Sequence, residues 1–289
     1  MSDRAKGVLS IVASAFGFAL MAAFVRLCDD FGGEVSSFQK SFFRNVVALV
    51  IAVVVFVRSR RAAVLPRQPL PGKAKALILL RSLLGTVGIF ANFYALSHIP
   101  IAEGQTLNKT APFFTVLFAW MFLGEKATPR SFGALALAFA GALFIVKPGF
   151  AGAAAFPLAT GLLGGLCAGG AYACVRALGL LRVEGALIIL VFSAFSCAAS
   201  VPFMLARFDP MTPAQIAILF GAGAGAAIGQ FGITAAYRFA APRSIAAYDY
   251  TNIVFTAAFG LFLFGQLLDL WTIAGIVLVF AAAFSLRRA

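Results

Sequence analysis

The chain has 289 residues, of which 62% are hydrophobic and only 11% are charged, and its formal net charge is +13. A soluble domain of this size needs more polar surface, so the composition excludes a soluble globular protein. The basic residues flank apolar stretches instead of forming one face, which argues against nucleic acid as their partner.

Ten apolar stretches are long enough to cross a membrane, because a spanning helix needs about 20 mainly apolar residues. The predicted spans are residues 7–28, 36–57, 76–97, 103–123, 130–147, 157–177, 184–206, 213–237, 244–265 and 270–286. The first stretch is too long for a signal-peptide core and further spans follow it, so we expect it to be retained. The chain therefore reads as a multi-pass membrane protein.

The basic residues concentrate in every second connection, whereas the remaining connections are mainly acidic. Positive connections lie on the cytoplasmic side of a membrane. This alternation predicts that the N- and C-termini are both cytoplasmic, and we expect the protein in a bacterial inner (plasma) membrane.

A shift of 141 residues superposes the fourth and fifth predicted spans on the ninth and tenth. The matched residues include Thr110, Phe114 and Gly124 in the first copy and Thr251, Phe255 and Gly265 in the second. A repeat of five spans enters the membrane from opposite sides in its two copies, as in many secondary transporters. We predict an all-α membrane protein of ten transmembrane helices, in which residues 1–148 and 149–289 form two inverted five-helix repeats around a central cavity.

Polar and ionisable side chains inside the spans are candidate functional groups, because burying them in a membrane costs several kcal/mol. The repeat aligns Asn108-Lys109 with Asp249-Tyr250, in each case just before the shared Thr. The candidate substrate-binding residues are Arg44, Asn92, Tyr94, Gln105, Asn108, Lys109, Gln230, Tyr237, Tyr248, Asp249 and Asn252.

The depth of each charge in its span suggests its role. Lys109 and Asp249 each lie about 8–9 Å from opposite faces of a membrane about 30 Å thick, which leaves on the order of 12 Å between them. We therefore expect a water-filled or substrate-filled space and no direct bond, although both groups can also snorkel to the interface. Arg44 suits a carboxylate or pairs with a loop acid such as Glu34. Arg81 lies nearer the basic side, where snorkelling to lipid phosphates is expected.

Helix-breaking and small residues predict local features of the spans. Pro112 lies inside the fourth span and is expected to kink it. Gly221, Gly225 and Gly229 recur at every fourth residue of the eighth span, a spacing that lets helices approach closely.

Three motifs give the chain a resemblance to a known family: Tyr94-Ala-Leu-Ser-His-Ile-Pro100, Ala111-Pro112 and Phe122-Leu-Gly-Glu-Lys126. With them the chain resembles the EamA-domain transporters of the drug/metabolite transporter superfamily, including amino-acid exporters of the YddG type. The resemblance implies ten helices in two inverted halves, with a cavity lined mainly by spans 1–4 and 6–9. The second half departs from the pattern, since Ile253 and Gln266 stand where the first half has Pro112 and Glu125.

Together these features predict a secondary transporter that exports small zwitterionic metabolites, with amino acids, aromatic ones included, as the favoured class. Lys109 and Arg44 are assigned to the substrate carboxylate, and Asp249 to its ammonium group or to a proton. Alternatives left open are an anionic metabolite, a nucleotide-linked compound or S-adenosylmethionine as substrate, and a non-transporting scaffold or receptor, or an ion channel.

We expect no enzymatic activity, because intramembrane hydrolysis needs a nucleophile–base pair or a metal site. The single histidine lies at a turn, and the four cysteines have no metal or disulfide spacing. No cofactor or metal is expected, and the expected partners are a small-molecule substrate and the lipid bilayer.

Overall fold

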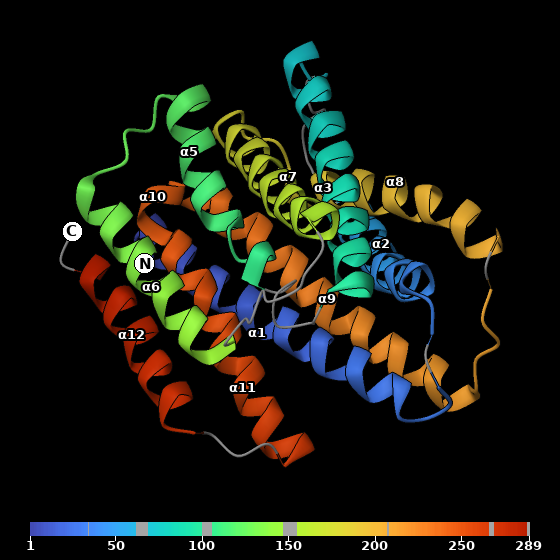
Figure 1. The fold of residues 1–289 in the computed structure, drawn as a ribbon. Helices are drawn as coiled ribbons and strands as arrows, with labels where there is room; N and C mark the ends of the chain where they lie inside the picture. The colour runs from blue at the N-terminus through green and yellow to red at the C-terminus, as the bar shows by residue number, and fades with distance from the viewer. Residues whose placement is uncertain are drawn as a thin grey trace.

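A computed structural model describes residues 1–33, 35–61, 69–99, 106–146, 155–206, 208–265 and 269–287. These residues form a bundle of helices (Figure 1). The helices are α1 (Asp3–Asp29), α2 (Ser37–Arg61), α3 (Gly72–His98), α5 (Ala111–Leu123), α6 (Pro129–Val146), α7 (Ala155–Leu180), α8 (Gly185–Ala206), α9 (Pro213–Phe239), α10 (Pro242–Ile245), the 3-10 helix η1 (Ala246–Tyr250), α11 (Thr251–Phe264) and α12 (Leu270–Arg287).

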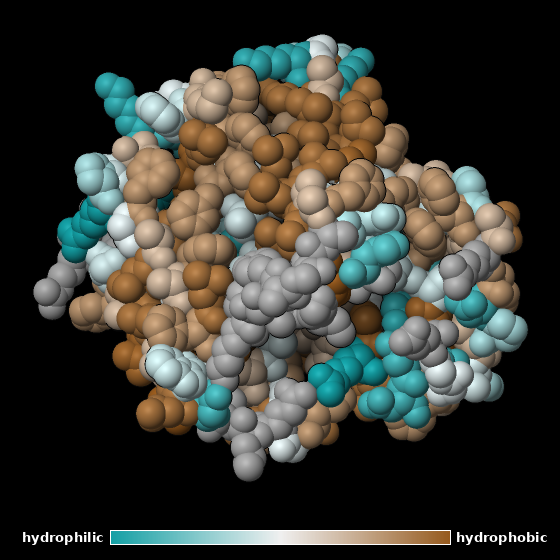
Figure 2. Space-filling view, viewed as in Figure 1, coloured by the Kyte–Doolittle hydropathy of each residue, from teal (hydrophilic) through white to brown (hydrophobic). Residues whose placement is uncertain are grey.

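Six helices in the described part of the chain are long and apolar enough to cross a membrane, namely α1, α2, α3, α7, α8 and α9. The apolar helices α6 and α12 are shorter. Large hydrophobic side chains are exposed along many of these helices, and Figure 2 shows hydrophobic residues over most of the drawn face. Such a surface is suited to lipid and not to water.

The helices follow the predicted spans closely, with two exceptions. The fourth predicted span is interrupted by a turn at residues 109–110, after which α5 begins. The ninth is divided into α10, η1 and α11. Pro112 therefore lies in the first turn of a new helix, where its missing N–H costs nothing, instead of kinking a continuous one.

The packing partners of the helices lie in opposite halves of the chain. Helix α1 packs along α9, α3 along α7, α2 along α8 and α6 along α12. Figure 1 shows α6, α11 and α12 on one side of the bundle and α2 and α8 on the other. The N-terminal end of α1 and the C-terminal end of α12 lie on the same side of the molecule.

Glycines set the closest helix contacts, as the spacing in the eighth span predicts. A Cβ at Gly17 of α1 would lie 2.7 Å from the carbonyl oxygen of Gly225 in α9, and a Cβ at Gly225 would lie 3.0 Å from the Gly17 carbonyl oxygen. Gly88 of α3 and Gly164 of α7 face each other with the corresponding distances both at 3.3 Å. The backbones of both pairs touch, so these four positions accept no side chain without a shift.

Candidate functional site

Two helix breaks near the middle of the bundle share one threonine hydrogen bond, although one is a turn and the other a 3-10 helix. Before α5, the Thr110 hydroxyl donates to the Leu107 carbonyl over 2.6 Å. Before α11, the Thr251 hydroxyl donates to the Tyr248 carbonyl over 2.7 Å. Each break leaves backbone groups outside a regular helix. Such backbone is tolerated within a membrane only inside the protein or beside a water-filled cavity, so the polar side chains of the breaks are expected to face the protein interior.

The breaks bring Lys109 and Asp249 together. Lys109 Nζ lies 3.8 Å from Asp249 Oδ2, and the two side chains are 13% and 14% exposed. The Tyr250 hydroxyl donates to the Lys109 carbonyl over 2.7 Å. The carboxylate and the ammonium group thus form an ion pair whose length exceeds that of a direct hydrogen bond.

The expectation that Lys109 and Asp249 lie too far apart to pair is therefore wrong. The depth calculation assumed straight α-helices that rise 1.5 Å per residue from opposite membrane faces. Lys109 instead lies in a turn, and Asp249 lies in a 3-10 helix that follows another short helix. The 3-10 helix rises about 2.0 Å per residue, and the long Lys stem covers part of the remaining distance.

Arg44 of α2 faces this region from another side. Its guanidinium carbon lies 5.8 Å from the ring centroid of Phe18 in α1, a cation–π distance. In the described ranges it makes no ion pair with an acidic side chain. Glu34, the loop acid considered as its partner, lies outside the described residues.

Arg81 of α3 is only 1% exposed, so the expectation that it snorkels to lipid phosphates is wrong. Its guanidinium carbon lies 3.7 Å from the ring centroid of Phe192 in α8. Its Nε atom has no hydrogen-bond partner among the described residues. The space for the guanidinium group comes from Gly85, one turn further along α3, where a Cβ would collide with Arg81 Nη1 and with Phe192.

Two tyrosines connect these charges. Tyr172 of α7 stacks on Tyr237 of α9 with ring centroids 5.5 Å apart. Arg44, Arg81 and Asp249 all lie within electrostatic range of Tyr172. We call Arg44, Arg81, Lys109, Tyr172, Tyr237 and Asp249 the central cluster. These residues come from α2, α3, α7, α9, η1 and the turn before α5, and in the described ranges they comprise three cations, one anion and two tyrosines.

Four further candidate residues are buried or half-buried. Gln230 is 4% exposed and its Nε2 atom has no partner among the described residues, as is also true of Asn92 Oδ1. Tyr248 is 8% exposed, and Asn108 is half-buried in the turn before Lys109. Buried amide groups without a partner are available to a ligand or to water.

Three candidates are placed elsewhere or are not described. Asn252 donates from Nδ2 to the Ala15 carbonyl over 2.9 Å and so links α11 to α1. Tyr94 is 40% exposed and stacks on His98 with centroids 4.1 Å apart, at the end of α3. Gln105 lies outside the described residues.

Sequence reasoning missed the burial of Arg81 and the part played by Tyr172 and Phe192. Arg81 and Gly85 are one helical turn apart, which was the available sign that the guanidinium group has room to turn inward. Tyr172 and Phe192 carried no comparable sign, because aromatic residues are frequent throughout the chain.

An ion pair joins helices at the end of the bundle that lies beside the α5–α6 connection. Arg176 Nε lies 2.6 Å from Glu125 Oε1, and Arg176 Nη1 donates to the Tyr237 carbonyl over 3.5 Å. Arg243 donates to the Lys126 carbonyl. These contacts hold the α5–α6 connection against α7, α9 and α10.

Different contacts close the opposite end. Lys40 Nζ of α2 lies 2.8 Å from the Asp29 carboxylate of α1. Asp209, before α9, accepts from the Ser36 amide over 2.8 Å, and the Gln39 side chain donates to the Asp209 carbonyl over 2.9 Å. Both ends of the central region therefore carry polar contacts between helices of different halves of the chain.

Comparison with known proteins identifies the family. Residues 5–147 match the EamA-like transporter family. The pseudopaline exporter CntI of Pseudomonas aeruginosa (strain UCBPP-PA14) is 31% identical over 284 residues, which cover 98% of this chain and 96% of that protein. A riboflavin transporter of Rhizobium johnstonii is 28% identical over 73% of this chain and 69% of its own length.

A solved crystal structure shares the fold. It superposes with a TM-score of 0.77 at 16% sequence identity and covers 96% of this chain and 97% of its own. At this identity the likeness concerns the fold alone.

Proposed function

This chain belongs to the EamA-like transporter family, and from that premise we propose that it is a secondary transporter exporting small zwitterionic, amino-acid-like metabolites by alternating access. Like its relatives, which are named as transporters, it is a multi-pass membrane transporter and not an enzyme. A relative that aligns over 98% of this chain is named as an exporter, which supports the direction.

We propose ten membrane crossings arranged as two inverted repeats, residues 1–148 and 149–289. The bounds of α3 and α9 differ by the 141-residue shift at both ends, as do those of α6 and α12. The packing supports the same symmetry, because exchanging α1 with α7 and α3 with α9 turns the α1–α9 contact into the α7–α3 contact. Likewise α1 packs on α11 as α7 packs on α5.

The central cluster is the proposed substrate site, and the observation that carries this assignment is the long Lys109–Asp249 pair beside two arginines without an acidic partner in the described ranges. A substrate carboxylate would bind Arg44 and Lys109, since a guanidinium fork matches a carboxylate. Its ammonium group, or a proton in its absence, would bind Asp249. Tyr172 and Tyr237 provide a surface for an apolar or aromatic side chain.

The excess of positive charge favours a second candidate, an anionic metabolite with more than one carboxylate or phosphate group. Such a substrate would use Arg81 as well as Arg44. The two candidates differ in charge balance, because a neutral zwitterion leaves the three cations and one anion of the cluster at a net charge of +2, whereas a dianion neutralises them.

We propose that both termini face the cytoplasm of a bacterial inner membrane. The ends of α1 and α12 share one side of the molecule, and the basic connections of the sequence support the cytoplasm as that side. Cysteine-accessibility labelling at residues 2 and 289 tests this orientation. Labelling of the two positions from different sides of the membrane would contradict it.

Counterflow into proteoliposomes tests the transport function. Vesicles preloaded with unlabelled phenylalanine or glutamate should accumulate the same labelled amino acid. We expect Asp249→Asn and Lys109→Ala to reduce this accumulation at least tenfold, and the exposed control Lys75→Gln to leave it unchanged. Full activity in both site variants would refute the assignment of the site, and preferred exchange of glutamate would favour the anionic candidate.

Two measurements separate a transporter from a channel and from a scaffold or receptor. A steady conductance in planar bilayers would indicate a channel. A scaffold or receptor would give neither conductance nor counterflow with any member of the amino-acid panel.

A further inference from the structure

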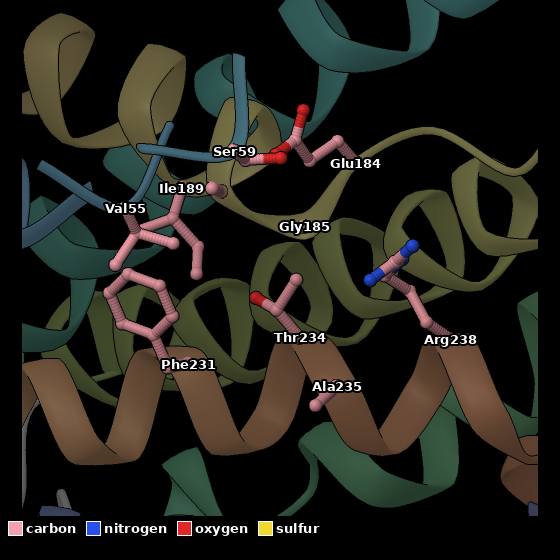
Figure 3. Close-up of a pocket in the computed structure, with 10 residues that line it drawn as sticks. Val55, Ser59, Glu184, Gly185, Ile189, Phe231, Thr234, Ala235 and Arg238 are labelled. Atoms are coloured by element: carbon pink, nitrogen blue, oxygen red, sulfur yellow. The ribbon is translucent and has the colours of Figure 1, made fainter. Parts of the chain in front are cut away.

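A cavity separate from the central cluster lies between α2, α8 and α9. Its volume is about 270 Å³, and its walls come from the last turns of α2, the first turns of α8 and the C-terminal part of α9. Figure 3 shows the side chains of Phe231, Thr234 and Arg238 rising from α9 on one side and Val55 and Ile189 on the other.

The cavity concentrates positive potential at one point. A Cβ at Gly185 would lie 3.1 Å from Arg238 Nη1, so the guanidinium group lies directly against the first residue of α8. The first N–H groups of a helix have no partner inside the helix, and they carry about half a positive charge. Gly185 and Ala186 line the cavity, and a guanidinium group beside such a terminus favours an anion at the same place.

Two polar atoms of the cavity wall lack partners. Thr234 is only 1% exposed, and its hydroxyl oxygen has no hydrogen-bond partner among the described residues. Arg238 Nε is also buried without one. A buried hydroxyl that lines a cavity and bonds to nothing in the protein indicates that a ligand or a water bonds to it.

The acidic residue of the cavity, Glu184, interacts electrostatically with Arg238 and offsets part of this potential. Glu184 precedes α8, and Figure 3 shows its carboxylate beside Ser59, on the far side of Gly185 from Arg238. Glu184 offsets about one positive charge. Arg58, Arg60 and Arg61 add three more in the last turn of α2.

The remaining wall is apolar and continues onto the outer surface of the bundle. Val55, Ile189 and Phe231 form it. Val55 is one of several exposed valines of α2, with Val50, Val53, Val54 and Val57. A small soluble anion buries no apolar surface against such a wall, whereas an acyl chain does, and this burial is favourable.

We propose that this cavity binds an anionic phospholipid, with its phosphate between Arg238, the Thr234 hydroxyl and the N-terminus of α8, and with an acyl chain along Val55, Ile189 and Phe231. The basic end of α2 is where the proposed orientation puts the cytoplasmic headgroups, and basic sites between helices on that side suit anionic lipids. The lipid fills a gap between α2, α8 and α9, which belong to different halves of the chain.

Thermal unfolding of the purified, delipidated full chain in detergent tests the proposal. The probes are phosphatidylglycerol, phosphatidylcholine and inorganic phosphate at constant ionic strength. We expect phosphatidylglycerol to raise the unfolding temperature clearly more than phosphatidylcholine, and inorganic phosphate to have no comparable effect. A ligand that binds only the folded state stabilises it in proportion to the logarithm of its concentration.

The variants locate the effect. Arg238→Gln and the nearly isosteric Thr234→Val should each lose most of the phosphatidylglycerol shift, whereas Arg60→Gln, at the same end of α2 but outside the cavity wall, should keep it. If Arg238→Gln does not fold, the phosphatidylglycerol shift of Thr234→Val tests the proposal by itself. A shift that survives in both cavity variants, an equal shift with phosphatidylcholine, or an equal shift with inorganic phosphate would overturn the proposal.

Discussion

The helix breaks before α5 and α11 share one hydrogen bond and the end of the following helix, but they differ in backbone conformation and in charge. Thr110 and Thr251 make the same hydroxyl-to-carbonyl hydrogen bond, and each following helix ends at a glycine in the left-handed conformation, Gly124 at φ 68° and Gly265 at φ 63°. Yet one break presents Lys109 and the other Asp249. The threonine hydrogen bond and the glycine helix end are thus common to both copies, whereas the backbone of the break and the charge of its side chain distinguish them.

The largest expected effect comes from making the two breaks alike in charge. Lys109→Asp would place two carboxylates where an ion pair now lies, and we expect counterflow to fall on the order of 100-fold. Breaking a buried pair costs about 3–5 kcal/mol, and partial exposure of these side chains reduces this to about 2 kcal/mol.

The exchange variant Lys109→Asp with Asp249→Lys sharpens the comparison. Because the pair is restored with its direction reversed, we expect stability to recover by most of the loss while transport stays low. Recovery of transport together with stability would show that the pair only holds the helices together and does not orient the substrate.

A smaller effect is expected from Gly85→Ala. The added Cβ collides with the Arg81 guanidinium and with Phe192, so the cation must leave its position over the ring. We expect about a tenfold loss of glutamate counterflow, more than for phenylalanine, if Arg81 binds a second carboxylate. Gly133→Ala is the matched control, because nothing lies within 4 Å of a Cβ there. Equal losses for both amino acids would argue against that role.

The two helix ends should respond equally to substitution. Gly124→Ala and Gly265→Ala each force a side chain into the left-handed region, which costs about 1–2 kcal/mol. Nothing lies within 4 Å of a Cβ at either position, so the backbone is the whole cause. Unfolding in a denaturing detergent should show equal losses, and losses that differ by more than about 1 kcal/mol would break the equivalence of the two copies.

The smallest effect is expected from Thr110→Val and Thr251→Val. Each removes one hydroxyl hydrogen bond to a carbonyl, worth about 1 kcal/mol. The losses measured in the same unfolding assay should be similar, and they should add in the double variant because the two bonds share no partner.

The sequence predicted the helices well, because runs of apolar residues and the charges between them determine where a helix can lie in a membrane. The position of Gly225 also predicted a close helix contact, which the Gly17–Gly225 packing confirms. These are properties of single segments, and the residues of one segment suffice to read them.

The central cluster was harder to predict from the sequence, because it depends on contacts between segments. The Lys109–Asp249 distance depends on the 3-10 helix η1. No residue of the ninth predicted span indicated a 3-10 helix there. The burial of Arg81 depends on the Phe192 ring of another helix. Neither depth in the membrane nor residue type contains this information.

The Glu125–Arg176 ion pair is connected to the central cluster through two tyrosines. Arg176 also donates to the carbonyl of Tyr237, and the ring of Tyr237 stacks on Tyr172, which lies one turn before Arg176 on α7. If a substrate binds beside these rings, as proposed, we expect its binding to act on the Glu125–Arg176 ion pair through Tyr237. Only one helical turn separates Tyr172 from Arg176, so the proposed substrate site and the ion pair at the end of the bundle are expected to respond together.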